Sequence, residues 1–133
     1  AYLAATFSGV TAKVDYEVLG SDDGLYGFAT PLATLHKFNG WTDQFLSTPA
    51  QGLQDLKFSL SGGLAGGKWL LAYHDFSADD SSNAVDDLGS EFNVQYTKKF
   101  AGKYNFGIKY GTYDAGDTKV DANRFWMWVG TRF

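Results

Sequence analysis

The chain has 133 residues, an ordinary length for one domain, and a net charge of -4 at pH 7. It contains no cysteine, which excludes disulfide bonds, thiol catalysis and cysteine-based metal sites. The negative charge, with no basic stripe, argues against nucleic acid as a partner. No apolar run approaches the roughly 18 residues of a membrane-spanning helix. The chain also opens without a signal peptide, which leaves a mature form, a fragment or a cytosolic protein.

Apolar and polar residues alternate with a period of two, the spacing typical of β-strands. In the segment YNFGIKYGTYD, for example, one face carries Tyr104, Phe106, Ile108, Tyr110 and Thr112, while Asn105 and Lys109 lie on the other. No helix of normal length is predicted. We interpret residues 20–53 as a long loop without strands, the alternative being a further strand pair within it. The pattern predicts seven strands in a single β-barrel segment, at residues 2–7, 10–19, 54–61, 68–77, 88–100, 104–115 and 122–133.

The alternation fits either a soluble barrel with its apolar face inward or an outer-membrane barrel with that face toward lipid. Most of the strands are long enough to cover the roughly 9–11 residues needed to cross a bilayer at a tilt. Short and long connections alternate, as in transmembrane barrels. Aromatic residues also gather in two bands at the strand ends, although aromatic packing in a β-sandwich is an alternative. These observations favour an antiparallel transmembrane β-barrel in the outer membrane of a Gram-negative bacterium, with the lipid bilayer and lipopolysaccharide as partners.

The predicted strand number is odd, whereas bacterial single-chain barrels have an even number of strands. With seven antiparallel strands, the first and last would run in the same direction. We therefore expect the chain to be the C-terminal portion of a larger even-stranded barrel, whose missing N-terminal strands are its partners. The last stretch, RFWMWVGTRF, ends on Phe133, which we interpret as an outer-membrane assembly signal.

The polar face of these strands carries both charge signs and is expected to line a water-filled lumen. A wall of mixed charge is compatible with small hydrophilic solutes, but it does not indicate whether cations or anions are preferred. The predicted pore-lining residues are Lys13, Asp15, Glu17, Asp55, Lys57, Glu91, Asn93, Gln95, Lys109, Arg124 and Arg132.

Loop 20–53 is too apolar for a freely solvated connection, and long ordered loops are usually functional. We expect Leu35, Phe38 and Trp41 to be buried, because burial of large apolar side chains offsets the entropy of ordering the loop. Gly40 is expected to supply a sharp turn between Phe38 and Trp41. The loop either narrows a pore or docks on a partner protein at the extracellular side. The polar residues expected to make contacts beside this turn are His36, Lys37 and Asp43.

The segments TPLATLHKFNGWTDQFLSTPAQGLQDL, LLAYHDFSADD, GSEFNVQYTKKF and GIKYGTYDAGD resemble the C-terminal region of outer-membrane porins of the proteobacterial alginate-export family. The resemblance covers about Val10 to Phe133. Its most specific part is the spacing of His36, Lys37, Gly40 and Asp43. The resemblance implies a large monomeric barrel, a signal peptide, N-terminal strands absent here, and passive movement of solutes.

The leading functional hypothesis is a porin-like channel for passive diffusion of small hydrophilic or anionic solutes. The alternative is a structural or docking barrel whose loops bind a partner protein, and a soluble ligand-binding barrel comes third. We expect no enzyme activity and no cofactor, because His36 and His74 have no serine-centred motif beside them. The two histidines are also far apart in the sequence, so their spacing does not indicate a metal site. The acidic stretches DFSADDSSNAVDD and DAGDTKVD are interpreted as solvated loops, with divalent cations bridging to lipopolysaccharide as the alternative. Neither stretch matches an EF-hand Ca²⁺ loop.

Overall fold

The computed structural model describes residues 1–31, 38–81 and 84–131, which form strands and turns without a helix. The functional residues predicted at positions outside these ranges are Leu35, His36, Lys37, Arg132 and Phe133.

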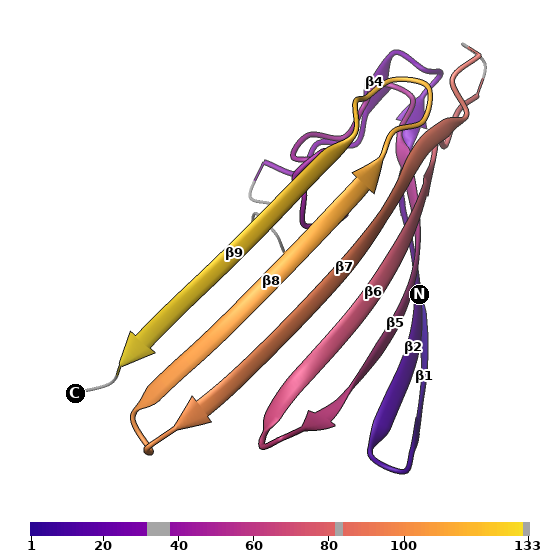
Figure 1. The fold of residues 1–133 in the computed structure, drawn as a ribbon. Coiled ribbons are helices and arrows are strands. Elements are labelled where there is room, and N and C mark those ends of the chain that lie inside the picture. Colours follow the sequence, from indigo (N-terminus) through magenta and orange to yellow (C-terminus); the bar gives the residue numbers. More distant parts are fainter. Residues whose placement is uncertain (32–37, 82–83, 132–133) are drawn as a thin grey trace.

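Seven strands lie side by side in chain order as one curved antiparallel sheet (Figure 1). The predicted all-β, antiparallel class is therefore confirmed. The long connections lie at one end of this sheet, here called the loop end, and the short connections lie at the other, the turn end (Figure 1). The strands are β1 (Tyr2–Phe7), β2 (Val10–Leu19), β5 (Leu53–Leu64), β6 (Gly67–Ser77), β7 (Asp87–Phe100), β8 (Tyr104–Asp114) and β9 (Ala122–Thr131).

The connection from β2 to β5 contains a small hairpin, so the expectation that residues 20–53 hold no strand is wrong. Strands β3 (Ser21–Asp22) and β4 (Tyr26–Gly27) pair antiparallel. The chain reverses at Asp23 and Gly24, which both have positive φ angles, 48° and 71°. Strands of two residues are too short to show a period-two pattern, so alternation could not predict them.

The glycine-rich stretch from Gly62 to Gly67 is mostly strand rather than the connection that its composition suggested. Only Ala65 and Gly66 remain in the turn between β5 and β6, and both have positive φ, 49° and 77°. Two consecutive positive φ angles are the signature of the type I′ turn, whose twist matches that of the strands it joins. The ring of Trp69 covers Gly62, where an added Cβ would lie 3.0 Å from Trp69 Cζ2.

The two edge strands of the sheet, β1 and β9, run in the same direction because six antiparallel pairings separate them. Among the described strands, each edge strand has a neighbour on one side only, so the described part of the chain is an open sheet and not a closed barrel. A direct pairing of β1 with β9 would have to be parallel.

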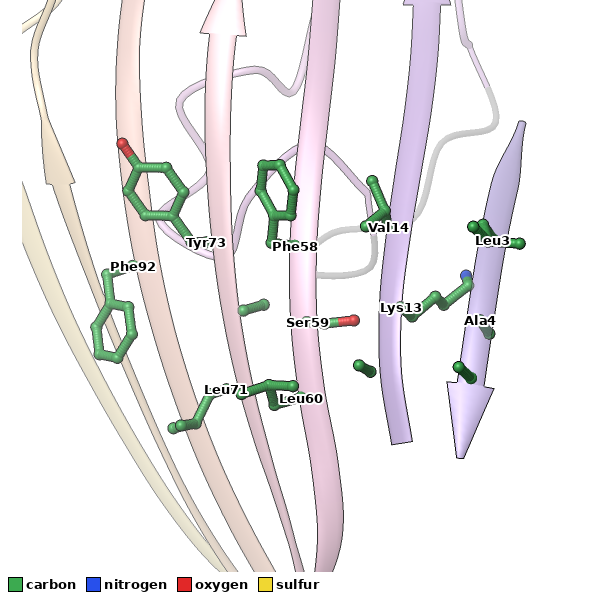
Figure 2. A pocket seen from close by; sticks show the side chains of 13 residues that line it. Leu3, Ala4, Lys13, Val14, Phe58, Ser59, Leu60, Leu71, Tyr73 and Phe92 are labelled. Atoms are coloured by element: carbon green, nitrogen blue, oxygen red, sulfur yellow. The ribbon is translucent and has the colours of Figure 1, made fainter. Parts of the chain in front are cut away.

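The two faces of the sheet have the opposite burial from that of a typical water-soluble protein. The apolar face is exposed: Leu3 has 76% of its surface accessible and Met127 has 66%. Figure 2 shows Leu3, Val14, Phe58 and Tyr73 in one row across neighbouring strands, beside a hollow of about 510 Å³. The polar face instead contains buried side chains, including Asp55, His74, Glu91 and Asn93.

The main hydrophobic core is small and lies at the loop end of the polar face. Phe45, from the long connection, packs on Phe76 at a ring distance of 4.6 Å and on Tyr113 at 6.1 Å. Leu53, Ala78 and Leu88 complete this cluster. The core therefore fastens the long connection to β5, β6, β7 and β8 at the loop end.

Candidate functional site

The candidate site is the polar face of the sheet together with residues 38–45, which lie over it and are called the covering segment below. Trp41, Thr42 and Phe45 of this segment are buried. Three kinds of interaction join the segment to the strands: hydrogen bonds to a carboxylate, an ion pair, and contacts between a lysine and tryptophan rings.

Glu91 of β7 is the principal anchor of the covering segment. Its carboxylate accepts hydrogen bonds from the backbone N–H of Trp41, from the Thr42 hydroxyl, and from the Thr42 backbone N–H at 3.1 and 3.2 Å. Only 1% of Glu91 is exposed. A buried carboxylate is costly unless it is hydrogen-bonded, and bonds to a charged group are stronger than neutral ones. The donors from the segment thus offset the burial of this charge.

Gly40 allows the covering segment to approach Glu91 closely. Its φ angle is 88°, a conformation that favours glycine. A Cβ at this position would lie 2.6 Å from Glu91 Oε2. Gly40 therefore makes the sharp turn expected from the sequence, and the reason is both backbone conformation and the space that the carboxylate occupies.

Two further contacts hold the segment toward β8 and β9. Asp43 forms an ion pair with Arg124 of β9, whose side chain is partly exposed. The Lys109 ammonium of β8 lies 4.3 Å from the centre of the Trp41 ring and 5.8 Å from that of Trp126. Such cation–π contacts are favourable when the cation is near the ring face. The contacts expected of His36 and Lys37 beside this turn concern residues outside the described ranges.

A polar network connects the start of the covering segment to β2, β5 and β6. The Asn39 amide donates to Glu17 at 3.0 Å and to Asp55 at 3.4 Å. Nδ1 of His74 lies 2.9 Å from both Asp55 oxygens, and the His74 ring stacks on Phe76 at 5.3 Å. His74 therefore orients a buried carboxylate. The sequence pattern did not identify Asn39, Thr42 or His74 as parts of one site.

The ten predicted pore-lining residues that the structure describes lie on the polar face, but not all of them face open space. Asp55, Glu91 and Asn93 are buried, so the expectation that they line a lumen directly is wrong for these three. The reason is that residues 38–45 lie above them. The other seven are partly or fully exposed: Lys13, Asp15, Glu17, Lys57, Gln95, Lys109 and Arg124.

The burial expected for the apolar residues of the loop is only partly found. Trp41 is buried, whereas Phe38 has 47% of its surface exposed, so the expectation for Phe38 is wrong. Phe38 borders hollows of the polar face, where Glu17 and Asn39 are its neighbours in the lining. A period-two pattern cannot assign burial within an irregular segment, since neighbouring residues there do not alternate between two faces.

Asn93 is a buried amide at the centre of the polar face. It is fully buried, and neither its Oδ1 nor its Nδ2 has a hydrogen-bond partner among the described residues. An added Cβ on Gly111, its neighbour across the strand pair, would lie 2.7 Å from Asn93 Oδ1. Gly111 therefore leaves the space that Asn93 needs beneath the covering segment.

Several acidic side chains of the long connections accept hydrogen bonds from neighbouring segments. Asp79 accepts from the Ser21 backbone N–H and from Gln54 Nε2, each at 3.1 Å. Asp117 accepts from the backbone N–H groups of Asp86 and Asp87, each at 3.3 Å. Within residues 1–31, 38–81 and 84–131, no three His, Asp or Glu side chains are grouped in a way that could hold a metal ion.

The described residues include no helix that is long and apolar enough to span a membrane. The chain matches no known protein-family model, no curated protein and no solved structure. The fold and site together define an all-β protein with a seven-stranded antiparallel sheet, an exposed apolar face and a polar face partly covered by a loop.

Proposed function

We propose that the chain is part of the wall of an outer-membrane β-barrel, a porin-like channel for passive diffusion of small hydrophilic or anionic solutes. The observation that carries this proposal is the exposed apolar face opposite a charged polar face. In a bilayer, acyl chains cover the apolar face and water fills the lumen beside the polar face. In water alone, the same exposed apolar face would be an aggregation hazard.

The dimensions of the sheet support this proposal. The six longer strands have 10 to 14 residues, while roughly 9–11 residues suffice to cross a bilayer at a tilt. Exposed aromatic residues lie toward both ends of the apolar face, such as Phe100 at the turn end and Tyr16 toward the loop end. Aromatic residues are enriched at both membrane interfaces. The loop end would then face the cell exterior and its lipopolysaccharide.

The open edges of the sheet support a larger barrel. Because β1 and β9 run in the same direction, an odd number of additional strands can join them with antiparallel pairing at both seams. Seven strands plus an odd number make an even total, as in bacterial single-chain barrels. We propose that the additional strands belong to the same polypeptide, as the resemblance to the alginate-export family implies.

The covering segment would narrow this channel. It lies against the polar face, and its anchors Glu91, Lys109 and Arg124 come from three consecutive strands of the wall. A segment fixed in this way reduces the space available to a solute without closing the barrel. The proposal includes no catalytic step and no cofactor, and it assigns His74 to holding Asp55.

Conductance of the full-length protein in planar lipid bilayers tests the proposal. We expect stable current steps in KCl, and larger steps after Trp41→Ala, because this change removes the ring over Lys109 and loosens the covering segment. The matched control is Trp69→Ala, on the opposite face, which should not enlarge the steps. The absence of current steps, together with the absence of liposome swelling, would rule out the channel.

A second candidate function is docking of a partner protein at the loop end. The observation that favours it is the exposure of Leu25, Tyr26 and Phe28, around the β3–β4 hairpin. Replacing all three by serine should leave conductance unchanged and abolish the partner contact in cross-linking on whole cells. If the triple variant instead changes conductance while all cross-links persist, these residues belong to the channel.

A further inference from the structure

A hollow of about 310 Å³ lies on the polar face between β1, β2 and β5, beside the covering segment. Its charged lining comes from β2 and β5, and Phe38 and Asn39 border it from the covering segment. A smaller hollow of about 170 Å³ shares Glu17, Phe38 and Asn39 with it. The partly exposed ring of Phe38 thus adjoins two spaces large enough for parts of one small molecule.

The charges around the larger hollow are separated into a positive and a negative part. In the positive part, Lys13 forms an ion pair with Asp15, and Lys57 Nζ lies 3.5 Å from the same carboxylate. Two ammonium groups therefore share one carboxylate. The lysine side chains remain partly exposed, at 36% for Lys13 and 30% for Lys57, so they can reach a solute.

In the negative part, Glu17 lies directly opposite Asp55 across the β2–β5 pair. Like charges in this position repel each other. The Asn39 amide donates to both carboxylates, at 3.0 Å to Glu17 and 3.4 Å to Asp55, and His74 Nδ1 lies 2.9 Å from Asp55. The described residues supply no ion pair to Glu17, whose side chain is exposed.

The two parts are close enough for one small ligand. Glu17 and Lys57 are diagonal neighbours in the register, because Lys57 pairs with Asp15 and Glu17 pairs with Asp55. Diagonal neighbours of an antiparallel pair are about 7–8 Å apart, within reach of long side chains. A purely anionic ligand would meet the repulsion of Glu17 and Asp55, and a purely cationic one would meet that of Lys13 and Lys57.

We propose that this hollow binds a small zwitterion, an aliphatic α-amino acid, as it passes through the channel. The ligand ammonium pairs with Glu17, the ligand carboxylate pairs with Lys57 and Lys13, and the aliphatic side chain lies against Phe38. The ligand thereby adds a counter-charge to each part. This inference rests on the proposed channel only in that the amino acid is a solute in passage.

Titration calorimetry of the full-length protein in detergent tests the inference with three probes. L-leucine carries both charges, leucine methyl ester carries only the ammonium, and N-acetyl-leucine carries only the carboxylate. We expect each single-charge probe to bind about tenfold more weakly than leucine, because each loses one charge-assisted contact. Equal affinity for the three probes, or no binding of leucine, would overturn the inference.

Two variants test which charge of the ligand each part of the hollow binds. Glu17→Gln should weaken leucine binding about tenfold but should not weaken N-acetyl-leucine, which loses a repulsion in this variant. Lys57→Met should weaken leucine binding but should not weaken the methyl ester, for the same reason. Lys68→Met, a lysine of the same face outside the hollow, is the matched control and should change none of the three affinities. If Lys68→Met loses leucine binding while the other two variants keep it, the ligand does not bind at Glu17 and Lys57.

Conductance separates this inference from the channel itself. If the protein conducts KCl but binds no leucine, the proposed channel stands and the proposed leucine site is wrong. If the protein binds leucine as described but never conducts, the leucine site stands and the proposed channel is wrong.

Discussion

The two faces of the sheet are built by the same seven strands, yet only one of them is covered by another part of the described chain. On the apolar face, Phe92 and Met127 remain exposed. On the polar face, Glu91 and Asn93 are buried beneath the covering segment. The polar face of this chain is thus the more buried one, although in a water-soluble protein the apolar face would be expected to form the interior.

Burial on the polar face depends on matching donors and acceptors. The Glu91 carboxylate meets the backbone N–H groups of Trp41 and Thr42, which would otherwise need water. In the proposed membrane setting, burial of the apolar face would need no such matching, because acyl chains offer only dispersion contacts and no hydrogen-bond partners. The two faces should therefore respond differently to the same kind of substitution.

The largest effect is expected for Glu91→Leu. Unpaired buried donors cost about 1–3 kcal/mol each, so with three donors affected we expect the covering segment to lose about 3 kcal/mol or more of local stability. Hydrogen exchange at the Trp41 and Thr42 amides measures this loss. Asn93→Leu is the matched control, since the Asn93 amide has no partner among the described residues. If both variants exchange alike, Glu91 does not hold the segment.

Paired arginine substitutions on β7 probe which face meets lipid. Val94 and Gln95 are adjacent, are half-buried to a similar degree, and point to opposite faces. Near the bilayer midplane, Val94→Arg should destabilise the protein by about 2–4 kcal/mol, and Gln95→Arg should cost much less. Urea unfolding in lipid vesicles gives both values. Equal costs would contradict the assignment of the apolar face to lipid.

A smaller effect is expected for Gly40→Ala, with Gly9→Ala as its control. Both glycines have positive φ, 88° and 80°, so both substitutions carry backbone strain. Only at Gly40 does the new Cβ also meet Glu91, while nothing lies within 4 Å at Gly9. Backbone strain costs about 1–3 kcal/mol in either variant. Gly40→Ala should destabilise the protein more than Gly9→Ala, because it adds a clash with Glu91. Thermal unfolding of the two variants compares them, and an equal loss would show that the covering segment can shift freely.

The smallest effect is expected for Lys109→Met, which removes the cation near the Trp41 ring. A cation–π contact contributes about 0.5–2 kcal/mol, so exchange at the Trp41 amide should rise modestly. Lys103→Met is the control, because Lys103 lies 5.3 Å from the Tyr104 ring, at the turn end. An unchanged exchange rate at Trp41 in both variants would mean that Glu91 and Arg124 hold the segment without Lys109.

The sequence alone determined the seven strands of the main sheet, their antiparallel order and the composition of the two faces, but not the β3–β4 hairpin. Period-two alternation encodes these features locally, and each strand pairs with its neighbour in the chain through a short turn or a longer connection. The turn at Gly40 was also predictable, because a glycine between two aromatic residues in a loop indicates an unusual backbone conformation.

Only the tertiary structure decided what covers the polar face. Trp41 and Glu91 are 50 positions apart, and no local pattern indicates that the backbone of one meets the carboxylate of the other. The pairing of Asn39 with Glu17 and Asp55 and the exposure of Phe38 also depend on where the covering segment lies. Alternation states which residues share a face, but hydrogen bonds between distant groups form only once the chain has folded and brought them together.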